Sequence, residues 1–415
     1  MAATSLWHPF ADMAAVDGRE VVIARGAGCW VWDEQGRRYL DGSASLWYCN
    51  VGHGRPEIAA AIQAQLAELD AFHVFGDLAN RPALALAERL AGFAPQAGSR
   101  VFLTSGGSDS IDTAVKLARF HHHTAGHPDR HVVLHRTHGY HGTHGIGTSI
   151  LGMPYRDGFG PLMPGTAEVP HDDLDALADA IATIGPERVA AFVFEPVIGS
   201  GGVHPPRPGY LEGAQALCRA HGIVTIADIV TNGFGRLGEW LAVERFGLEP
   251  DLIAFAKGVT SGYLPLGGVI VAPGIADPLW ADGASGFMHG QTYSGHPVCC
   301  AAALANLDLL AADGLVHRAR ADEGWFADGI GAVADHPLVG EVRAGVGFLA
   351  AIELAPDLVE SRPDAGSAFW HAARDEGLLS RGLADGIALS PALTVGDGEL
   401  EFAAGALRRA LDRLG

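Results

Sequence analysis

The sequence predicts an α/β fold: a mostly parallel sheet flanked by helices, joined to a smaller α+β domain. The first observation is that short apolar strands alternate with helical or loop segments between about residues 101 and 310. Several of these runs, such as VAAFVFEPV and GIVTIAD, are apolar almost throughout, which is typical of parallel strands buried on both faces. The second observation is a change of pattern after residue 314 to helix, strands and a final helix. These two patterns predict one large and one small domain.

These patterns divide the chain into three segments. Residues 1–50 hold the run GCWVWDEQGRRYLDG, which predicts a hairpin with its turn at residues 33–36. We expect this N-terminal segment to pack with the small domain, residues 314–415. The large domain, residues 51–313, begins with a helix over residues 56–71 and is predicted to have right-handed crossovers. Its predicted strands are VFLTS, HVVLHR, VAAFVFEPV, GIVTIAD, LIAFAK and LGGVIVA. In the small domain we expect a helix over residues 316–331, strands in VRAGVGFLAAIEL and IALSP, and a final helix ending in LRRALDRLG.

The amino-acid composition limits the classes of protein to which this chain can belong. The chain of 415 residues is 48% hydrophobic and 18% charged, as expected for a well-packed globular enzyme. Its formal net charge of −20 argues against nucleic acids and anionic membrane surfaces as partners. We read no signal peptide and no stretch near the roughly 20 apolar residues that a spanning helix needs. A cytoplasmic location is therefore expected.

The cysteines could form disulfides, and the histidines could bind a metal. The five cysteines are scattered over a long chain, so reduced thiols are expected. Histidines are dense between residues 121 and 144, but they lack HExxH spacing and an accompanying cysteine pair. We therefore expect no metal site.

An aspartate and a lysine are placed where ligands bind in this class of fold. Asp228 ends the run IVTIAD, and Lys257 follows LIAFA, so each is predicted at the carboxyl end of a buried strand. A lysine in apolar surroundings loses its proton readily and can form a Schiff base with an aldehyde. The aspartate supplies the anion that a protonated pyridine nitrogen needs. The pair predicts pyridoxal phosphate chemistry.

A phosphate site is predicted in TSGGSDSIDTAVKLARF. Glycines 106 and 107 permit close approach of the backbone after a strand, and a strong amphipathic helix is expected to begin at Asp112. Backbone N–H groups at a helix start, together with the helix dipole, favour anions.

These motifs, with HGYHGTHG, FVFEPVIGSGG, GFGRLGEW, AKGVTSGYLPLGG and HGQTYSGHP, resemble those of class III aminotransferases. The resemblance runs from Trp7 nearly to the C-terminus. It implies a fold-type I enzyme with pyridoxal 5′-phosphate as cofactor and Lys257 and Asp228 as catalytic residues. It also implies a homodimer with shared active sites, in which Thr292 reaches the phosphate of the neighbouring subunit.

The resemblance assigns the remaining cofactor contacts. Gly107 and Ser108 are expected at the phosphate, and Tyr140, followed by His141, on one face of the pyridine ring. Val230 is expected on the other face, with Glu195 supporting the ring and Asp228. The chain departs from the family at Ile111-Asp112, where Asn-Asp or Val-Glu is common, and at Ile229, where glutamate is frequent. Because side chains alternate along a strand, we expect Ile229 to point away from the cofactor.

The substrate side resembles one subgroup. The string LWYCNVGHG is similar to amine:pyruvate (ω-) transaminases, which implies that Trp47 forms a wall of the substrate pocket. Arg381 in GLLSRGLADG matches the arginine that binds a keto acid carboxylate and swings out for an apolar amine. Arg343 is the other arginine considered, and we expect it to anchor the small domain.

The sequence thus predicts an aminotransferase that moves an amino group from a primary amine or ω-amino acid to a keto acid, with pyruvate expected. Lys257 would carry the proton between the substrate carbon and the cofactor. Alternatives within the family are diaminopelargonate, ornithine or γ-aminobutyrate transaminases and an aminomutase. The N-terminal LWHPF is similar to the first of these, but LWYCNVGHG fits that branch poorly. A sensor domain that binds the cofactor without turnover is the non-enzyme alternative, which the acidic composition opposes.

Overall fold

The large sheet has seven strands and carries the centre of the molecule. The structure, a computed structural model, describes residues 5–16 and 18–415. Strand order is β4-β10-β9-β8-β7-β5-β6, and the pairs from β6 through β5, β7 and β8 to β9 are parallel. The strands span Arg100–Thr104 (β4), Val132–Arg136 (β5), Thr166–Val169 (β6), Val189–Phe194 (β7), Val224–Asp228 (β8), Leu252–Phe255 (β9) and Gly267–Val271 (β10). The mostly parallel sheet is confirmed.

Strand β10 is the exception, because it runs antiparallel to both β9 and β4. The link from β9 to β10, residues 256–266, holds only the 3-10 turn η4 (Lys257–Val259). A parallel neighbour requires a long crossover connection, whereas a short link turns the chain straight back. That turn places Lys257 directly at the strand end.

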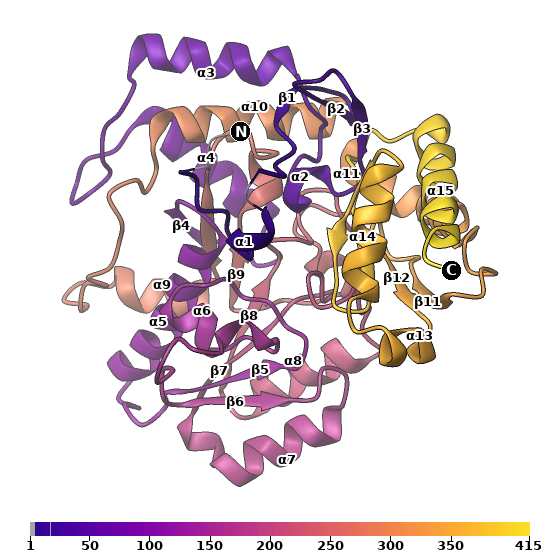
Figure 1. Ribbon diagram of the computed structural model, residues 1–415. Coiled ribbons are helices and arrows are strands. Elements are labelled where there is room, and N and C mark those ends of the chain that lie inside the picture. The colour runs from indigo at the N-terminus through magenta and orange to yellow at the C-terminus, as the bar shows by residue number, and fades with distance from the viewer. Residues whose placement is uncertain (1–4, 17) are drawn as a thin grey trace.

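Helices pack around this sheet (Figure 1). They span Pro56–Glu68 (α3), Arg81–Phe93 (α4), Gly107–Thr124 (α5), Gly145–Ser149 (α6), Leu174–Ile184 (α7), Tyr210–Ala220 (α8), Pro273–Trp280 (α9) and Pro297–Ala312 (α10). Helix α5 buries Ile111, Ala114, Val115 and Ala118, whose spacing places them on one face. The predicted start of this helix at Asp112 was wrong: it begins at Gly107, next to the end of β4.

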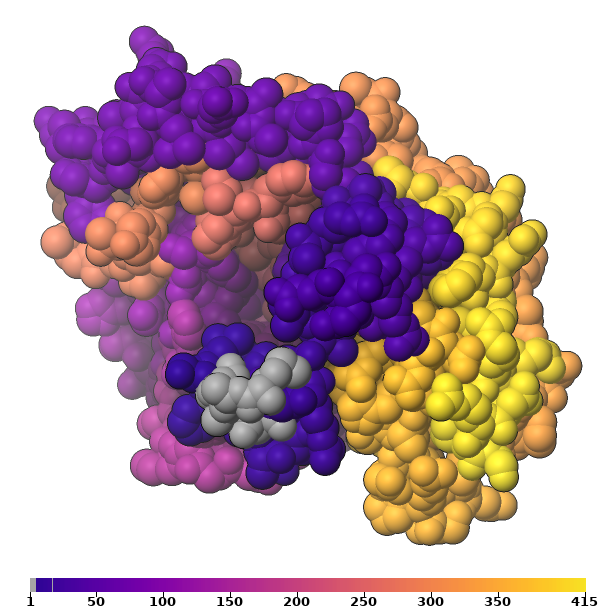
Figure 2. Space-filling model, turned by 45° about the horizontal axis from the view of Figure 1, so that its top comes forward, coloured from indigo at the N-terminus to yellow at the C-terminus, as the bar shows by residue number. Residues whose placement is uncertain are grey.

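Two smaller sheets accompany the large one, and the first of them joins the two ends of the chain. The first has the order β1-β2-β3-β13, and the second has the order β11-β12-β15-β14. Their strands span Ile23–Ala27 (β1), Trp30–Asp33 (β2), Arg38–Asp41 (β3), Val339–Arg343 (β11), Ala350–Leu354 (β12), Leu378–Leu379 (β13), Arg381–Gly382 (β14) and Gly386–Leu389 (β15). Strand β3 of the N-terminal hairpin pairs in parallel with β13, so the hairpin lies against the C-terminal segment. Figure 2 shows the indigo N-terminal residues beside the yellow C-terminal part. The domain limits at residues 50 and 313 stay a prediction.

The remaining helices are short or belong to the C-terminal part. They span Met13–Val16 (α1), Ala44–Trp47 (α2), Leu315–Ala321 (α11), Glu323–Gly331 (α12), Pro356–Ser361 (α13), Ala365–Asp375 (α14) and Asp397–Asp412 (α15), and three further 3-10 turns span Pro154–Arg156 (η1), Pro186–Arg188 (η2) and Val243–Phe246 (η3). The single helix predicted over residues 316–331 is in fact two, α11 and α12, which meet at Asp322. Among the described residues no single helix is long and apolar enough to cross a membrane, although α10 and α11, bent by 49°, meet the length and composition requirement as a pair.

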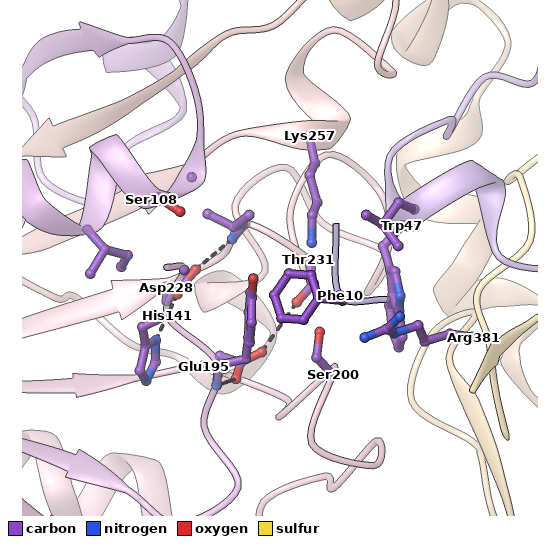
Figure 3. Close-up of a pocket in the computed structure, with 16 residues that line it drawn as sticks. Phe10, Trp47, Ser108, His141, Glu195, Ser200, Asp228, Thr231, Lys257 and Arg381 are labelled. Carbon is purple, nitrogen blue, oxygen red and sulfur yellow. Dashed lines mark hydrogen bonds and ion pairs between the residues drawn. The ribbon is translucent and has the colours of Figure 1, made fainter. Parts of the chain in front are cut away.

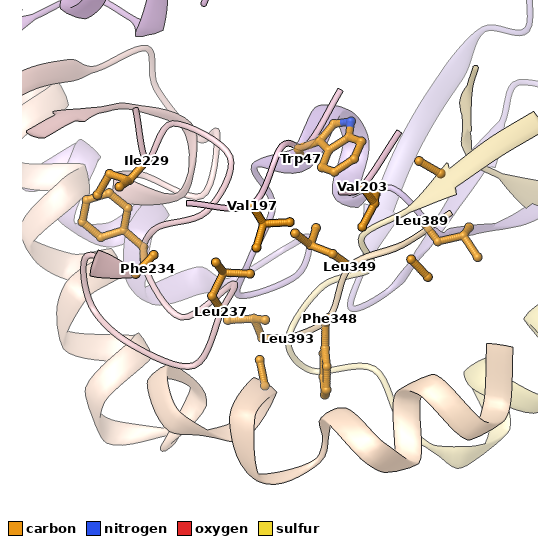
Figure 4. Close-up of a cluster of buried hydrophobic side chains, with 14 of the residues drawn as sticks. Trp47, Val197, Val203, Ile229, Phe234, Leu237, Phe348, Leu349, Leu389 and Leu393 are labelled. Carbon is orange, nitrogen blue, oxygen red and sulfur yellow. The ribbon is translucent and has the colours of Figure 1, made fainter. Parts of the chain in front are cut away.

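A buried arginine connects the large sheet to both ends of the chain. Arg236 is fully buried and donates to the carbonyl oxygens of Phe348 and Pro391 at 3.3 and 2.5 Å. Its other terminal nitrogen donates to Asn50 Oδ1 at 2.8 Å, and Asn50 in turn donates to the carbonyl of Phe234 at 2.9 Å. Around this network lies the apolar core that Figure 4 shows, with Leu237, Leu349 and Leu393 among its members. The arginine therefore holds three segments that are distant in sequence.

We expect Arg236→Met to lower the free energy of unfolding by about 3 kcal/mol, because buried carbonyl and amide oxygens lose their donor. Chemical denaturation followed by circular dichroism measures the change. Arg207→Met is the matched control, since the Arg207 side chain is 81% exposed and its ion pair with Asp172 lies at the surface. That variant should lose less than about 1 kcal/mol. Equal losses in the two variants would contradict a linking role for Arg236.

Candidate active site

A cavity of about 190 Å³ lies where several strands of the large sheet end. Asp228 is the last residue of β8, Glu195 follows β7, and Lys257 follows β9. The cavity is lined by Phe10, Leu46, Trp47, Gly107, Ser108, Ile111, Tyr140, His141, Gly142, Glu195, Ser200, Asp228, Val230, Thr231, Lys257 and Arg381. Its position agrees with the general rule that ligands of open α/β sheets bind at the carboxyl ends of the strands.

Lys257 points its amine into this cavity (Figure 3). Its side chain makes no hydrogen bond or ion pair with any residue that the structure describes. The surrounding protein displaces water, so burial lowers the pKa of Lys257 to about 8, against the opposing effect of Asp228 and Glu195. An amine with this pKa is partly neutral near neutral pH, which makes it a ready nucleophile and proton carrier.

Asp228 is held by two hydrogen bonds. Its Oδ2 accepts from His141 Nδ1 at 2.8 Å, and its Oδ1 accepts from the backbone N–H of Val230 at 3.0 Å. Both Asp228 and His141 are almost fully buried, and His141 Nε2 has no hydrogen-bond partner among the described residues. Ile229 lies in the hydrophobic core, between two residues that line the cavity. The carboxylate is therefore fixed in orientation with its charge directed at the cavity.

Glu195 connects three loops around the site. Its Oε1 accepts from the N–H of Tyr140 at 3.0 Å, and its Oε2 accepts from the N–H of Gly199 at 2.9 Å and more distantly from the Thr231 hydroxyl at 3.4 Å. Burial and the nearby charge of Asp228 raise the pKa of Glu195 above its ordinary value. Each loop thus takes its position from the same carboxyl group.

The start of α5 forms the wall expected to bind an anion. Gly107 must be glycine, because an added Cβ would lie 2.9 Å from Val230 Cγ1. Ser108 Oγ accepts from the N–H of Thr143 at 3.1 Å, which joins the helix start to the loop carrying Tyr140 and His141. Gly107 and Ser108 of this first turn line the cavity. The first N–H groups of a helix have no partner within the helix, and the helix dipole favours negative charge there.

The opposite end of the cavity combines apolar side chains with one arginine. Trp47 is only 2% exposed, so it both lines the cavity and belongs to the core, beside Val197 and Val203 in Figure 4. The side chain of Arg381 reaches the cavity from β14 and makes no hydrogen bond or ion pair with another described residue. Arg343 instead pairs with Glu341 and Glu353, away from the cavity.

Three residues of the cavity wall have strained backbones. Phe10, Trp47 and Lys257 have φ values of 54°, 67° and 49°, in the left-handed region that side-chain-bearing residues rarely adopt. Such strain persists only where the surroundings enforce it, and it concentrates at functional sites. Strain at these positions fits a site whose geometry is fixed by the rest of the fold.

Sequence reasoning missed several residues of the cavity. Residues without a prior role are Phe10, Leu46, Ile111, Gly142, Ser200 and Thr231. Ile111 could have been found, because it departs from the Asn or Val that is common at this position of the family motif, one helical turn after Gly107. Thr292 is exposed and lies outside the cavity of its own chain.

The lysine content gives a further signal that sequence reasoning did not use. The chain has only two lysines, Lys116 and Lys257, among its 28 basic residues. Lys116 is an exposed residue of α5, whereas Lys257 lies in the cavity. A lysine kept at a strand end in a chain that otherwise uses arginine is a strong candidate for chemistry that arginine cannot perform.

The residues of the cavity fit a phosphorylated pyridine aldehyde. They provide an amine for the aldehyde, a fixed anion for the ring nitrogen, and a helix start for the phosphate. Sequence comparison agrees: the family described as aminotransferase class-III matches residues 13–411. The chain belongs to the class III aminotransferases.

Three proteins are similar to this aminotransferase over nearly its whole length. It is 35% identical to the putrescine–pyruvate aminotransferase of Pseudomonas aeruginosa, over 98% of this chain and 93% of the relative. It is 36% identical to the omega-aminotransferase of Caulobacter vibrioides, over 99% and 98% of the two chains. The crystal structure of an amine transaminase from an uncultivated Pseudomonas species, in its pyridoxal phosphate-bound form, superposes with a TM-score of 0.94 at 37% identity over the full length of both chains.

These matches confirm four predictions made from the sequence. The aminotransferase has the fold of fold-type I transferases, it is an enzyme of the omega-transaminase type, it belongs to class III, and it depends on pyridoxal 5′-phosphate. The roles of individual residues stay predictions.

The pKa of Lys257 gives a direct test of the electrostatics in the cavity. In cofactor-free protein, reductive labelling of Lys257 by a small aldehyde should reach half its maximum near pH 8. Asp228→Asn should move this midpoint to lower pH, because the Asp228 charge raises the pKa of the lysine and its removal leaves burial less opposed.

Lys116 is the internal control, since mass spectrometry separates the two lysine peptides and the exposed lysine should not respond to Asp228→Asn. A shift of the Lys257 midpoint to higher pH, or an equal shift at Lys116, would contradict this account of the cavity.

Proposed function

We propose that this enzyme transfers the amino group of a small primary amine or ω-amino acid to pyruvate in a ping-pong cycle. The observation that carries the proposal is the guanidinium of Arg381, which has no hydrogen-bond or ion-pair partner among the described residues and lies in the same cavity as Lys257. A guanidinium presents two parallel N–H donors that match a carboxylate. Pyruvate has a carboxylate beside its carbonyl carbon, and a small amine does not need one.

Each proposed role follows from the position of the residue. Bound pyridoxal 5′-phosphate supplies an aldehyde for the substrate amine and a ring that draws electrons from the substrate carbon. Asp228, fixed by His141 and Val230, holds a proton at the ring nitrogen. Tyr140 and Val230 orient the ring, and the start of α5 at Gly107 and Ser108 binds the phosphate. Lys257, with its lowered pKa, moves a proton at the substrate carbon.

The carboxylates of the cavity favour a donor with one amine. Asp228 and Glu195 are the acidic residues that line the described cavity, and both already accept hydrogen bonds from the chain. A second ammonium group, as in ornithine, would find no uncommitted carboxylate among the described residues that line the cavity. Phe10, Leu46 and Trp47 instead offer apolar surface to the substituents of a monoamine.

Arg381→Ala should lower kcat/KM for pyruvate about 10- to 100-fold, because a charge-assisted hydrogen bond contributes about 1.5–3 kcal/mol. The half-reaction with a neutral aryl-alkyl amine should change much less. Single-turnover measurements of the two half-reactions, with alanine formation as the second readout, give both numbers.

Arg408→Ala is the matched control, since Arg408 lies on α15 and pairs with Asp335 at the surface. It should leave both half-reactions unchanged. Equal losses on the two half-reactions of Arg381→Ala would show a structural role instead. Loss confined to a carboxylated donor would point to a γ-aminobutyrate- or ornithine-type enzyme.

We also propose that the enzyme is a homodimer with shared sites, which an exposed apolar surface supports. Met288, Trp280 and Tyr293 are 96%, 65% and 67% exposed, and Phe75 on the neighbouring loop is 50% exposed. The ring of Phe75 lies next to Gly290, so the two loops adjoin. Large exposed apolar patches mark interaction surfaces. Thr292 is exposed and directly precedes Tyr293 in the chain, so we expect it to contact the second copy.

Thr292→Ala should weaken retention of the cofactor, because the phosphate loses a hydroxyl donor from the other subunit. Mixed dimers of Thr292→Ala and Lys257→Ala should recover activity at limiting cofactor, since one of the two sites then combines an intact lysine with an intact threonine. The two parent homodimers, each carrying one change in both subunits, are the controls. Mixed dimers no more active than the parents would place Thr292 outside the shared site.

A cytoplasmic location stays a prediction, with which five buried free cysteines are consistent.

A further inference from the structure

The hydroxyl of Ser200 lies in the cavity on a loop that is fixed on both sides. Glu195 accepts from Gly199 N at 2.9 Å, and Arg343 Nε donates to the carbonyl of Gly202 at 2.9 Å. An added Cβ at Gly201 would lie 2.0 Å from the carbonyl oxygen of His138, so the loop packs tightly against the neighbouring turn. The position of Ser200 is therefore set by the fold.

Among the polar side chains that line the cavity, Ser200 has an uncommitted hydroxyl. Ser108, His141, Glu195, Asp228 and Thr231 all have hydrogen-bond partners on the chain. Tyr140, Ser200, Lys257 and Arg381 have no side-chain hydrogen bond to a described residue. The proposed function uses the ring of Tyr140, the amine of Lys257 and the guanidinium of Arg381. It leaves the hydroxyls of Tyr140 and Ser200 without a role. Of the two, the Ser200 hydroxyl is the one on the loop that is fixed on both sides.

Figure 3 shows this hydroxyl directed into the cavity, on the side where Arg381 enters. The guanidinium alone can bind both oxygens of a carboxylate through two parallel hydrogen bonds. The keto acid therefore does not require Ser200. The amine donor occupies the same cavity in the other half of the cycle, and its substituents then face the serine.

A hydroxyl in a wall of apolar side chains discriminates between such donors. An apolar substituent that covers it removes water and returns no hydrogen bond, which leaves a polar group unsatisfied. A substituent with a hydroxyl at the same place replaces the lost water. Sites that hydrogen-bond a substrate hydroxyl therefore discriminate against the analogue that lacks it.

We propose that Ser200 is a specificity-determining residue that hydrogen-bonds an oxygen substituent of the amine donor, and that small amino alcohols are a donor class of this enzyme. This inference rests on the proposed transamination to pyruvate and specifies the donor side of that site.

The test compares two donors of matched configuration, 2-amino-1-propanol and 2-aminobutane, in which a hydroxyl replaces a methyl group of similar size. The measured quantity is the ratio of their kcat/KM values in holoenzyme with pyruvate as acceptor. Ser200→Ala should lower this ratio, amino alcohol over alkyl amine, by about 3- to 10-fold, as expected for one neutral hydrogen bond.

Thr231→Val is the matched control, because it also removes a hydroxyl from the cavity wall. That hydroxyl already accepts from Asn232 Nδ2 at 2.7 Å, so its loss should affect the two donors alike and leave the ratio unchanged. Thr231→Val also tests whether any disturbance of this wall changes the ratio.

An unchanged ratio in Ser200→Ala, or the same fall in Thr231→Val, would overturn the proposal. A rise in KM for pyruvate in Ser200→Ala without a change in the ratio would also overturn it, by assigning the hydroxyl to the keto acid. If wild-type enzyme reacted with neither donor, the proposed function itself would fail, which is distinct from either of these results.

Discussion

Two buried carboxylates beside one lysine set the conditions for the rest of the site. Glu195 lies close to the charge of Asp228, and burial together with this charge raises the pKa of Glu195. The fold compensates with directed donors: a histidine and backbone N–H groups from the loops after β5, β7 and β8. The same hydrogen bonds stabilise the buried carboxyl groups and hold those loops in place. The pKa of Lys257 also depends on this arrangement, because burial lowers it while the nearby negative charge raises it.

The sheet explains why residues so distant in sequence meet. Parallel order brings the ends of β7 and β8 to one edge, and the short return from β9 to β10 adds Lys257 to it. The small domain and the N-terminal hairpin close the other side, where Arg381 and Trp47 enter. Arg236 joins these parts through Asn50, Phe348 and Pro391. The cavity thus depends on contacts between all three segments of the chain and not on the large sheet alone.

Prediction from sequence succeeded where one local pattern carries the information. Apolar runs that end in Asp228 and Lys257 indicate strand ends, and strand ends of one sheet lie together. It left the direction of β10 open, because direction depends on the connecting segment, and it was wrong about the start of α5, where glycines masked the first turn. Ser200 and Phe10 were missed for a different reason. Each is a single loop residue whose place in the cavity depends on tertiary contacts, such as the packing of Gly201 on His138, that no local pattern encodes.

The scarcity of lysine has a chemical consequence outside the cavity. An aminotransferase produces aldehydes or ketones from amines and works with an aldehyde cofactor, and such carbonyl compounds condense with any accessible primary amine. Arginine does not undergo this condensation readily, because its guanidinium stays protonated. With Lys116 as its one lysine besides Lys257, the folded surface exposes few amines to its own reactive products. The arginine-rich surface therefore limits self-modification, and carbonyl groups are left to react at the amine in the cavity.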